Sequence, residues 1–477
     1  MSKPSKQIAI NWISKNESMI IDVSDKIWKY AELGLQEHKS SKLLVEELQN
    51  HGFQVELGVA GMPTAIIASY GSGRPVIGIL GEYDAMPGLS QKAVPYMTPL
   101  KKGAPGHGCG HNLFGASGMA GAIAAKIAIE NAGLKGTVKF FGTPAEETLV
   151  GKVFMVRDGC FKGVDAVLSH HIGAANTASL KSSNAMNSVK FEFYGTSAHA
   201  GSTPWQGRSA LDAVELMDIG VNFMREHVVP QSRIHYVIQD GGGQPNVVPP
   251  TASSWYFVRA PERQTVEHIY DWIVEIAEAA AKMTRTRLEV KFQTGVHNRI
   301  PNRTLAELIV KEMRAIGAPS YTSKELEFAN KIGEQISPED KRTWGYHVPN
   351  GPQDLMDVDL DTRIIDPWGD GETAGGSTDE ADISWNLPTQ GFNTGSRIIG
   401  APGHHWMTAA PCGMSIGHKN LIFASKVLAA TTIELLTNHE ILEKASEEFK
   451  RRMVNKTYKS PLPKELSPPL QQFMSYS

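Results

Sequence analysis

The sequence has little cysteine, no excess of charge of either sign and no long apolar run. Three cysteines among 477 residues are too few for a disulfide framework, so free thiols are expected. Lys and Arg number 47 against 50 Asp and Glu, a formal net charge of −3. This balance removes the electrostatic reason to expect a nucleic acid or an anionic membrane as partner. No apolar run reaches the roughly 18 residues of a membrane span, because the best candidate, 113–129, is broken by Ser117 and Lys126, and it predicts a buried helix.

Targeting signals and common catalytic motifs are also missing. The N-terminal residues MSKPSKQIAINWISKNES lack an apolar core followed by a small-residue cleavage site, so no secretion signal is expected and a cytoplasmic location is predicted. In that compartment a free thiolate can act as a metal ligand or a nucleophile. The chain has no G-x-G-x-x-G, P-loop, G-x-S-x-G, H-E-x-x-H or C-x-x-C sequence. Nucleotide binding, serine hydrolysis and simple zinc motifs are therefore without support.

The length and the apolar pattern predict two domains, one of them α/β. Two helices are expected near the start, around 21–28 and 43–48. Apolar runs then alternate with helical periodicity, which is typical of a mostly parallel sheet with helices on its faces. The predicted strands are 54–57, 64–69, 76–80, 137–142 and 166–168, with helices at 113–131 and 153–157.

From about residue 183 the pattern changes to a βαββαβ unit. Its predicted strands are 188–194, 234–239, 253–259 and 287–292, with helices at 209–226 and 266–283. We therefore predict a catalytic domain over 1–182 and 297–477, and an inserted ferredoxin-like domain over 183–296. Further helices are expected around 305–313 and 421–436. The stretch 318–376, rich in Asp, Gly and Pro, is predicted to be irregular, and such long loops are usually functional or disordered.

Residues that can bind metals follow the predicted strands of the first domain. In open α/β sheets, ligands bind at the carboxyl ends of the strands, so these side chains are expected to meet at one edge. They are Glu82 and Asp84 after one strand, Cys109 and His111 before the long helix, Glu146 and Glu147 after the next strand, His170 and His171 after the third, and His404 and His405 late in the chain.

The chemistry of these residues suits a borderline divalent ion such as zinc. A thiolate can bridge two metals, and Cys109 and His111 lie two residues apart, so both can face one site. Of the paired carboxylates, one can bind metal while the other takes a proton from metal-bound water. Taken singly, each group also has a structural explanation: a lone buried cysteine usually behaves as a small hydrophobe, which is how we interpret Cys160 and Cys412.

The chain resembles, over nearly its whole length, the dinuclear metallohydrolases that include aminoacylase, acetylornithine deacetylase and the folate-cleaving glutamate carboxypeptidase. Each segment that carries the resemblance is unspecific alone, but the combination is highly specific. The segments are GEYDAMPGLS, GHGCGHNL, GTPAEET, SAHAGSTPWQGRSALDAV, PNVVPP, PNRTLAE, GGSTDEADISW and SIGHKN.

The resemblance implies two divalent metal ions per chain, zinc or manganese. Cys109 stands where most of the family has a bridging aspartate, as in the amidohydrolase subgroup. His111 and His171 would complete one metal site with it. Glu147 and His404 would complete the other.

The resemblance also implies the roles of residues around the metals. Glu146 would be the general base, and Asp84 would orient a ligand. Glu82 occupies the place of a ligand histidine in the wider family, so His111 is expected to substitute for it and the role of Glu82 is open. His170 and His405 remain adjacent alternatives to His171 and His404.

In the family the inserted domain dimerises and lends groups to the active site. By matching motifs, His199 would stabilise the oxyanion from the partner subunit, and Asn246 would bind the same region. Arg259 would hold the substrate carboxylate, because a guanidinium pairs with it through two hydrogen bonds. The structural alternatives are a hydrogen-bonded turn histidine for His199 and a surface strand residue for Arg259.

The function expected from this resemblance is hydrolysis of an amide bond in an N-acyl amino acid with a free carboxylate. An aroyl-glutamate such as p-aminobenzoyl-glutamate is the first choice. Three alternatives stay open: the same scaffold acting on other acyl groups or small peptides, hydrolytic removal of an aromatic amino group, and a partner subunit without catalysis. A homodimer formed through the inserted domain is expected, and the need for a second, related subunit is left open.

Overall fold

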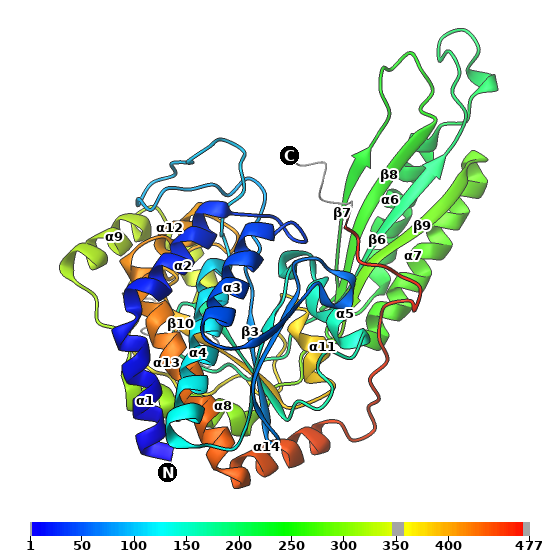
Figure 1. Ribbon diagram of the computed structural model, residues 1–477. Helices are drawn as coiled ribbons and strands as arrows, with labels where there is room; N and C mark the ends of the chain where they lie inside the picture. The colour runs from blue at the N-terminus through cyan, green and yellow to red at the C-terminus, as the bar shows by residue number, and fades with distance from the viewer. Residues whose placement is uncertain (1, 346–356, 471–477) are drawn as a thin grey trace.

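The computed structural model describes residues 2–345 and 357–470, which form a body around a six-stranded sheet and an attached four-stranded unit (Figure 1). The order in the larger sheet is β1-β2-β4-β3-β5-β10. The pairs β4–β3, β3–β5 and β5–β10 are parallel, and β1–β2 and β2–β4 are antiparallel. The predicted α/β class with a mostly parallel sheet is confirmed. The strands are β1 (Gln54–Leu57), β2 (Ile66–Ser72), β3 (Val76–Gly81), β4 (Gly136–Gly142), β5 (Ala166–Gly173) and β10 (Thr389–Gly395).

Helices cover both faces of this sheet, which is why its central strands read as continuous apolar runs. Glycines let α4 approach β3 closely. A Cβ on Gly118 would lie 2.4 Å from the Leu80 carbonyl oxygen, and one on Gly115 would lie 2.8 Å from that of Glu82. The helices of the body are α1 (Ser2–Lys15), α2 (Glu17–Tyr30), α3 (His38–Asn50), α4 (His111–Ala132), α5 (Gly151–Arg157), α8 (Arg303–Ile316), α9 (Ser323–Gly333), α10 (Pro338–Gly345), α11 (Glu380–Ser384), α12 (Trp406–Cys412), α13 (Ser415–Thr437) and α14 (His439–Arg452).

Helices α4 and α13 are long and apolar enough to span a membrane by length and composition. Within their most apolar windows, however, 94% of the residues of α4 and 89% of those of α13 are buried inside the molecule. The two helices pack on one another in the largest hydrophobic core. Their apolar character is therefore accounted for by burial in the protein, as the sequence predicted for 113–129.

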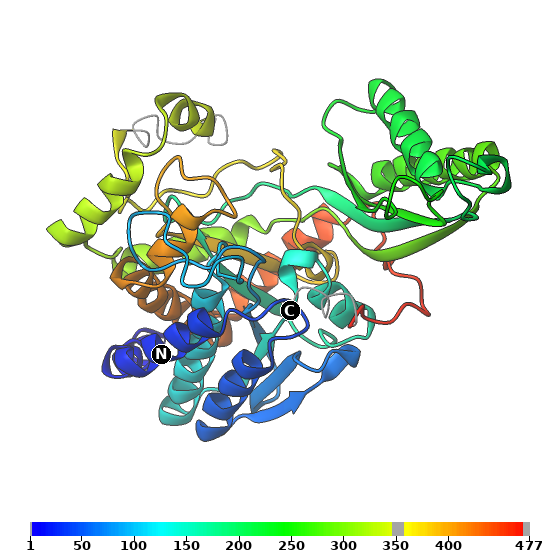
Figure 2. The same cartoon turned by 90° about the horizontal axis from the view of Figure 1, so that it is seen from above.

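The second sheet has the order β7-β8-β6-β9 with every neighbouring pair antiparallel. This is the predicted βαββαβ unit, and α6 and α7 bury its apolar face in a core of its own. It projects to one side of the body (Figure 2). Its elements are β6 (Ala185–Tyr194), α6 (Ala210–Met224), β7 (Arg233–Asp240), β8 (Thr251–Ala260), α7 (Arg263–Thr284) and β9 (Arg287–Val296). They all lie within 183–296, the range predicted for the inserted domain.

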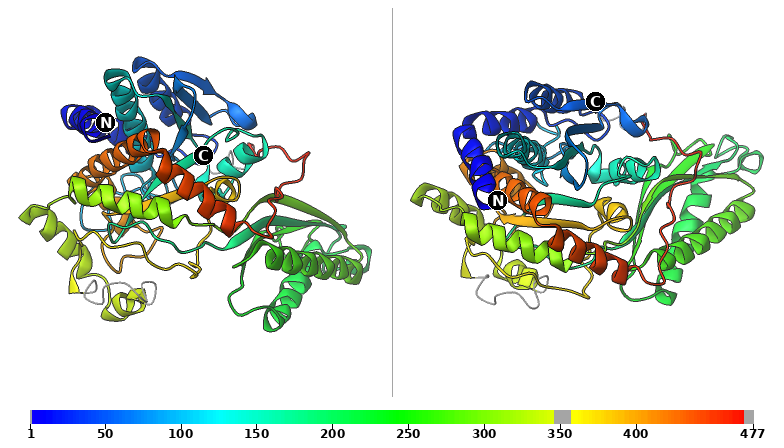
Figure 3. Two further views of the ribbon diagram at one scale, coloured as in Figure 1. Left: turned by 90° about the horizontal axis from the view of Figure 1, so that it is seen from below. Right: turned by 60° about the horizontal axis from the view of Figure 1, so that its bottom comes forward.

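After α14 the chain runs extended along the junction between the body and the four-stranded unit (Figure 3). Leu462 is buried there, and the backbone oxygen of Lys459 accepts a hydrogen bond of 2.9 Å from His297 Nε2. Tyr458 donates to Asp382 at 2.9 Å. This segment therefore connects the two parts of the molecule.

Several predictions for secondary structure were wrong. The start has three helices instead of two, because α1 buries only a narrow apolar stripe that includes Ala9 and Ile13. The stretch 318–376 is not wholly irregular: it contains α9, which begins with a capping box between Thr322 and Glu325, and α10. Its residues 346–356 lie outside the described residues.

The strand predicted at 166–168 continues to Gly173, so His170 and His171 lie within β5 and not after it. The continuation depends on β10, a strand that was not predicted, which pairs in parallel with Val167–Gly173. A polar sequence can extend a buried strand here because the neighbouring strand satisfies its backbone groups.

Candidate metal centre

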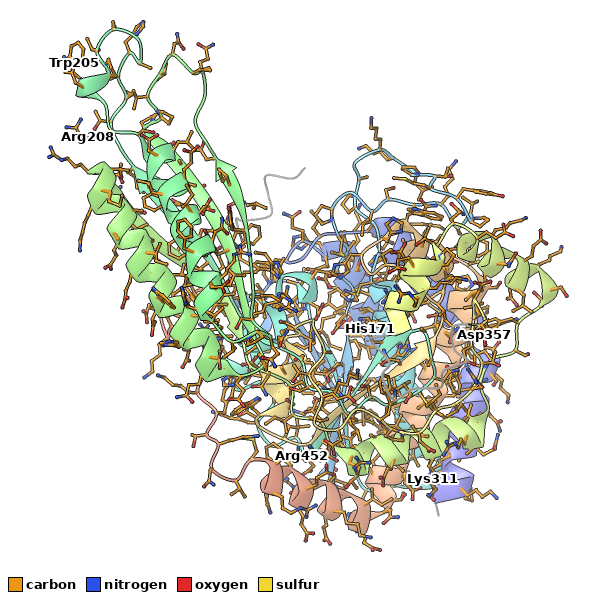
Figure 4. The ribbon with its side chains drawn as sticks, turned by 180° about the vertical axis from the view of Figure 1, so that it is seen from behind. His171, Trp205, Arg208, Lys311, Asp357 and Arg452 are labelled. Carbon is orange, nitrogen blue, oxygen red and sulfur yellow. The ribbon has the colours of Figure 1, made fainter. Side chains whose placement is uncertain are left out.

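The metal-capable side chains meet at the carboxyl edge of β3, β4 and β5. Glu82 follows β3, η2 (Glu146–Thr148) follows β4, and His171 lies near the end of β5. They line a cavity of about 340 Å³ together with Cys109 and His404. His171 lies inside the body, on the sheet side of this edge (Figure 4). The convergence expected from the strand order therefore holds in the structure.

Unusual backbone geometry directs these side chains inward. Gly110 has φ 77° and ends the loop before α4, so Cys109 and His111 fall on either side of the turn. Ala145 and Leu149 have φ values of 55° and 58° and bracket the short helix η2. Positive φ values at non-glycine residues are strained and gather at functional sites. His404, at φ 52°, is another such position.

Two groups of potential ligand atoms share one thiol. The candidate atoms of Cys109, His111 and His171 lie within 4.8 Å of one another, and so do those of Cys109, Glu147 and His404. Cys109 Sγ lies 3.4 Å from His171 Nε2, and His404 Nε2 lies 3.5 Å from Glu147 Oε2. A shared sulfur between two sets of nitrogen and oxygen donors is an arrangement that can hold two neighbouring divalent ions.

Asp84 orients the donors around it. Its Oδ1 lies 2.8 Å from His111 Nδ1, and its Oδ2 accepts a 2.9 Å hydrogen bond from the Glu147 backbone N–H. The side chains of Asp84 and His111 are both fully buried. With Nδ1–H donating to Asp84, His111 presents Nε2 as its free donor atom, which is how a carboxylate fixes the tautomer of a metal-binding histidine.

The buried charges of the site raise and lower several pKa values. Burial lowers the pKa of His111, but Asp84, Glu147 and Glu82 outweigh burial and hold that pKa well above its ordinary value. Burial raises the pKa of Glu147 to about 7, with Asp84 adding to the effect. Burial, reinforced by Glu147, raises the pKa of Cys109 to about 12. Surroundings that disfavour so many anions would stabilise a cation placed among them.

The donor set fits divalent metal ions. His111 Nε2 and Glu147 Oε1 are buried and find no hydrogen-bond partner among residues 2–345 and 357–470. Buried polar atoms are rarely left unsatisfied, so such atoms call for an explanation, and a bound ion supplies one. Sulfur, imidazole and carboxylate donors suit zinc, while the carboxylates also suit manganese.

The adjacent histidines differ clearly in their surroundings. His170 is buried, with its ring nitrogens 3.0 Å from Ser117 Oγ and 2.9 Å from Thr394 Oγ1, so both are occupied inside the protein. Burial holds its pKa well below the ordinary value. His405 packs against Trp406 and does not line the cavity, whereas His404 does. The geometry favours His171 and His404 as the ligand candidates.

Sequence reasoning missed a buried ion-pair network beneath the cavity. Lys152 Nζ lies 2.8 Å from Glu82 Oε1 and 2.7 Å from Asp379 Oδ1, and its backbone N–H donates to Asp379 Oδ2 at 2.8 Å. The Lys152 and Asp379 side chains are fully buried. A lysine in a short amphipathic helix usually lies at the surface, and the sequence gives no signal for its burial. Asp379 lies in the segment GGSTDEADISW, where no role was predicted for it.

The residues predicted for substrate binding are divided between two places. Arg259 lies on β8 and lines the same cavity, where it donates to Ser377 Oγ at 3.1 Å. Its Nε is buried without a hydrogen-bond partner in the described residues. His199 and Asn246 are exposed and lie close together in loops, where the Asn246 carbonyl accepts from Ala200 N–H. They do not line the cavity of their own chain. Trp205, in the loop that follows His199, marks the far end of the four-stranded unit (Figure 4).

Comparisons with known proteins point in one direction. The profile of Peptidase family M20/M25/M40 matches residues 78–336. One of the two subunits of the p-aminobenzoyl-glutamate hydrolase of Escherichia coli (strain K12) is 38% identical over 470 residues, covering 96% of this chain and 97% of that protein. The Xaa-Arg dipeptidase of Mus musculus is 27% identical and covers 90% and 89%. A dinuclear metal-binding peptidase of the M20 family from Bacillus subtilis has a similar fold, with a TM-score of 0.54 at 17% identity, covering 89% and 99%.

The Asp84–His111 contact generates a first prediction. Replacing the carboxylate in Asp84→Asn removes the acceptor that fixes His111, and loss of such a partner weakens metal binding by about 10–100-fold. Titration of the metal-free protein with Zn²⁺ against a competing chelator measures this affinity.

A matched control is Asp25→Asn, because Asp25 Oδ1 also lies 2.8 Å from a histidine, His418 Nε2, but outside the cavity. We expect its affinity to equal that of the wild type. Unchanged Zn²⁺ affinity in Asp84→Asn would show that the contact does not orient a ligand.

Proposed function

The chain belongs to peptidase family M20/M25/M40, and from this premise we propose that it is a metal-dependent amidohydrolase that cleaves N-acyl or N-aroyl amino acids. The observation that carries the proposal is the convergence of two potential ligand sets on Cys109 at the edge of the parallel sheet. Two ions bound there would acidify a water molecule and polarise the scissile carbonyl, which is the chemistry that amide hydrolysis needs.

The substrate that we propose first is an aroyl-glutamate resembling p-aminobenzoyl-glutamate. The 38% identical relative supports it, since its name states that substrate. The cavity supports it as well: Phe257 offers an aromatic wall, and Arg259 has a buried Nε–H without a partner among the described residues. A guanidinium in this condition gains most from a carboxylate, the group that every N-acyl amino acid carries.

In the proposed mechanism Glu146 acts as the general base. Burial raises the pKa of Glu146 well above its ordinary value, and the Glu82 carboxylate raises it further. A carboxylate with a raised pKa can take the proton of the attacking water and hold it until the amine leaves. Glu146 Oε2 lies 3.9 Å from His111 Nε2, close to the donors but not needed as one of them. Arg259 would hold the substrate carboxylate, and His199 of a second copy would face the developing oxyanion.

A dipeptidase acting on peptides with a basic residue is a second candidate. Its support is Glu380, which lines the cavity and has a buried Oε1 without a hydrogen-bond partner in the described chain. A carboxylate there could receive a cationic side chain, in line with the name of the 27% identical relative. Against it, Arg299 Nε lies 3.8 Å from Glu380 Oε1 and neutralises part of its charge.

The four-stranded unit is proposed to form a homodimer that completes the site. Phe223 on α6 is 74% exposed, Trp205 is 71% exposed, and Val237 lies exposed on the edge strand β7. An apolar surface beside an open strand edge favours association with another chain. Such a dimer would give exposed His199 and Asn246 a site to act on, that of the neighbouring subunit. Whether a second, related subunit takes part stays open.

A hydrolysis screen tests the proposed substrate class. With Zn²⁺ or Mn²⁺ added, p-aminobenzoyl-glutamate and other N-acyl amino acids should be cleaved to an acid and an amino acid. Amidation of the free α-carboxylate should raise KM sharply, because Arg259 then meets no anion. Preferential cleavage of dipeptides that end in arginine would favour the second candidate. Metal-loaded protein that cleaves none of these compounds would contradict the proposed function.

The general base is tested by Glu146→Ala. We expect kcat to fall by at least about 10²–10⁴-fold, because general base catalysis contributes that much, while metal content stays close to that of the wild type. Steady-state kinetics combined with elemental analysis makes both measurements. Turnover that survives the substitution would exclude Glu146 as the base.

The contribution of His199 across the dimer is tested by mixing two inactive variants. Glu146→Ala and His199→Ala chains, unfolded and refolded together, should regain part of the activity. A hybrid dimer has one site with an intact Glu146 and the His199 of its partner. If the mixture stays as inactive as each variant alone, His199 does not act across the dimer.

A further inference from the structure

Glu82 has one carboxylate oxygen fixed by the protein and the other turned toward the ligand cluster. Lys152 Nζ contacts Oε1 at 2.8 Å, and Asp379 holds the same ammonium at 2.7 Å. All three side chains are almost or completely buried. Burial acts to lower the pKa of Lys152, but the Asp379 and Glu82 carboxylates more than offset it, so the ammonium keeps its charge. Glu82 Oε1 is thereby occupied, and Oε2 is left as the free oxygen.

The free oxygen lies at a ligand-like distance from the free nitrogen of His111. Glu82 Oε2 is 3.3 Å from His111 Nε2, a nitrogen that is fully buried and has no hydrogen-bond partner among the described residues. Two donors about 2.1 Å from one ion lie roughly 3.0 Å apart at a right angle and roughly 3.4 Å apart in a tetrahedron. The observed separation falls between these values. The corresponding oxygen of Glu146 is 3.9 Å away, outside this range.

We propose that Glu82 is a ligand of the ion held by His111, and that Lys152 and Asp379 are positioning residues that restrict Glu82 to one oxygen. Glu82, His111 and Glu146 form a third group whose candidate atoms lie within 4.8 Å of one another. The proposal rests on the metal centre of the proposed function. It goes further because it gives a role to Glu82 and to a buried ion-pair network that the hydrolytic mechanism does not use.

The arrangement also bears on the choice of metal. A carboxylate is a harder donor than imidazole or thiolate and suits manganese better. The His111 site would then combine one sulfur, two nitrogens and one oxygen, while Lys152 offsets part of the added negative charge. Removing the Glu82 carboxylate should therefore weaken Mn²⁺ binding more than Zn²⁺ binding at this site.

The test measures metal binding to metal-free protein and needs no turnover. Wild type, Glu82→Gln and Glu82→Asp are titrated with Mn²⁺ and with Zn²⁺ against a chelator. We expect Glu82→Gln to bind one of the two Mn²⁺ ions at least about tenfold more weakly, as for loss of a group that acts on a metal site, and the other nearly unchanged. Glu82→Asp, which keeps the charge but withdraws the oxygen, should lie between the two. Folded Glu82→Gln that binds both ions with wild-type affinity overturns the proposal.

A second variant tests the positioning residues. Lys152→Met frees Glu82 Oε1 and should change the visible spectrum of bound Co²⁺, which reports the number and geometry of its ligands. The matched control is Lys6→Met, because Lys6 also lies between two carboxylates, Glu312 at 2.7 Å and Glu434 at 2.5 Å, far from the cavity. The control should lower the Tm but leave the Co²⁺ spectrum unchanged. If Lys152→Met melts at a lower temperature with an unaltered Co²⁺ spectrum, Lys152 has a structural role alone.

Two kinds of failure are distinguishable in these titrations. Wild-type protein that binds no divalent ion contradicts the metal centre and with it the proposed function. Wild-type protein that binds two ions beside a Glu82→Gln variant that binds them equally well contradicts the role of Glu82 and leaves the proposed function intact.

Discussion

The crowding of anionic and ligating side chains in one buried cavity is the constraint on which the rest of the structure depends. Glu82, Asp84, Glu146 and Glu147 lie around a single thiol, and burial raises the pKa of Cys109 and of Glu147. Such a cluster costs free energy unless cations are close, because desolvated like charges repel one another. The protein supplies one cation, Lys152. Divalent metal ions would supply the remaining positive charge.

The fold explains how residues so distant in the sequence reach one place. Parallel strands end at the same edge of the sheet, and glycines bring α4 close enough to β3 for His111 to contact Asp84. The four-stranded unit adds Arg259 to the cavity from a different sheet. Specificity and chemistry thus come from separate parts of the chain, which lets the substrate-binding wall change without disturbing the ligands.

The sequence predicted what depends on local pattern and missed what depends on tertiary contact. Strand periodicity and loop position brought out Cys109 and His171, together with the βαββαβ unit. Helix α1 and strand β10 were missed because their apolar patterns are weak alone and gain stability from neighbours. Lys152 was missed because its two carboxylate partners lie far away in the sequence. The place of His199 could not be derived from one chain, since its proposed target lies in another subunit.

Metal content measured on the purified chain tests the central claim most directly. Elemental analysis of the wild type should find about two divalent ions per chain. The same analysis of Cys109→Ala should find both ions depleted together, because one thiolate serves both ligand sets. A wild type without stoichiometric metal, or a Cys109→Ala chain that keeps both ions, would contradict the account.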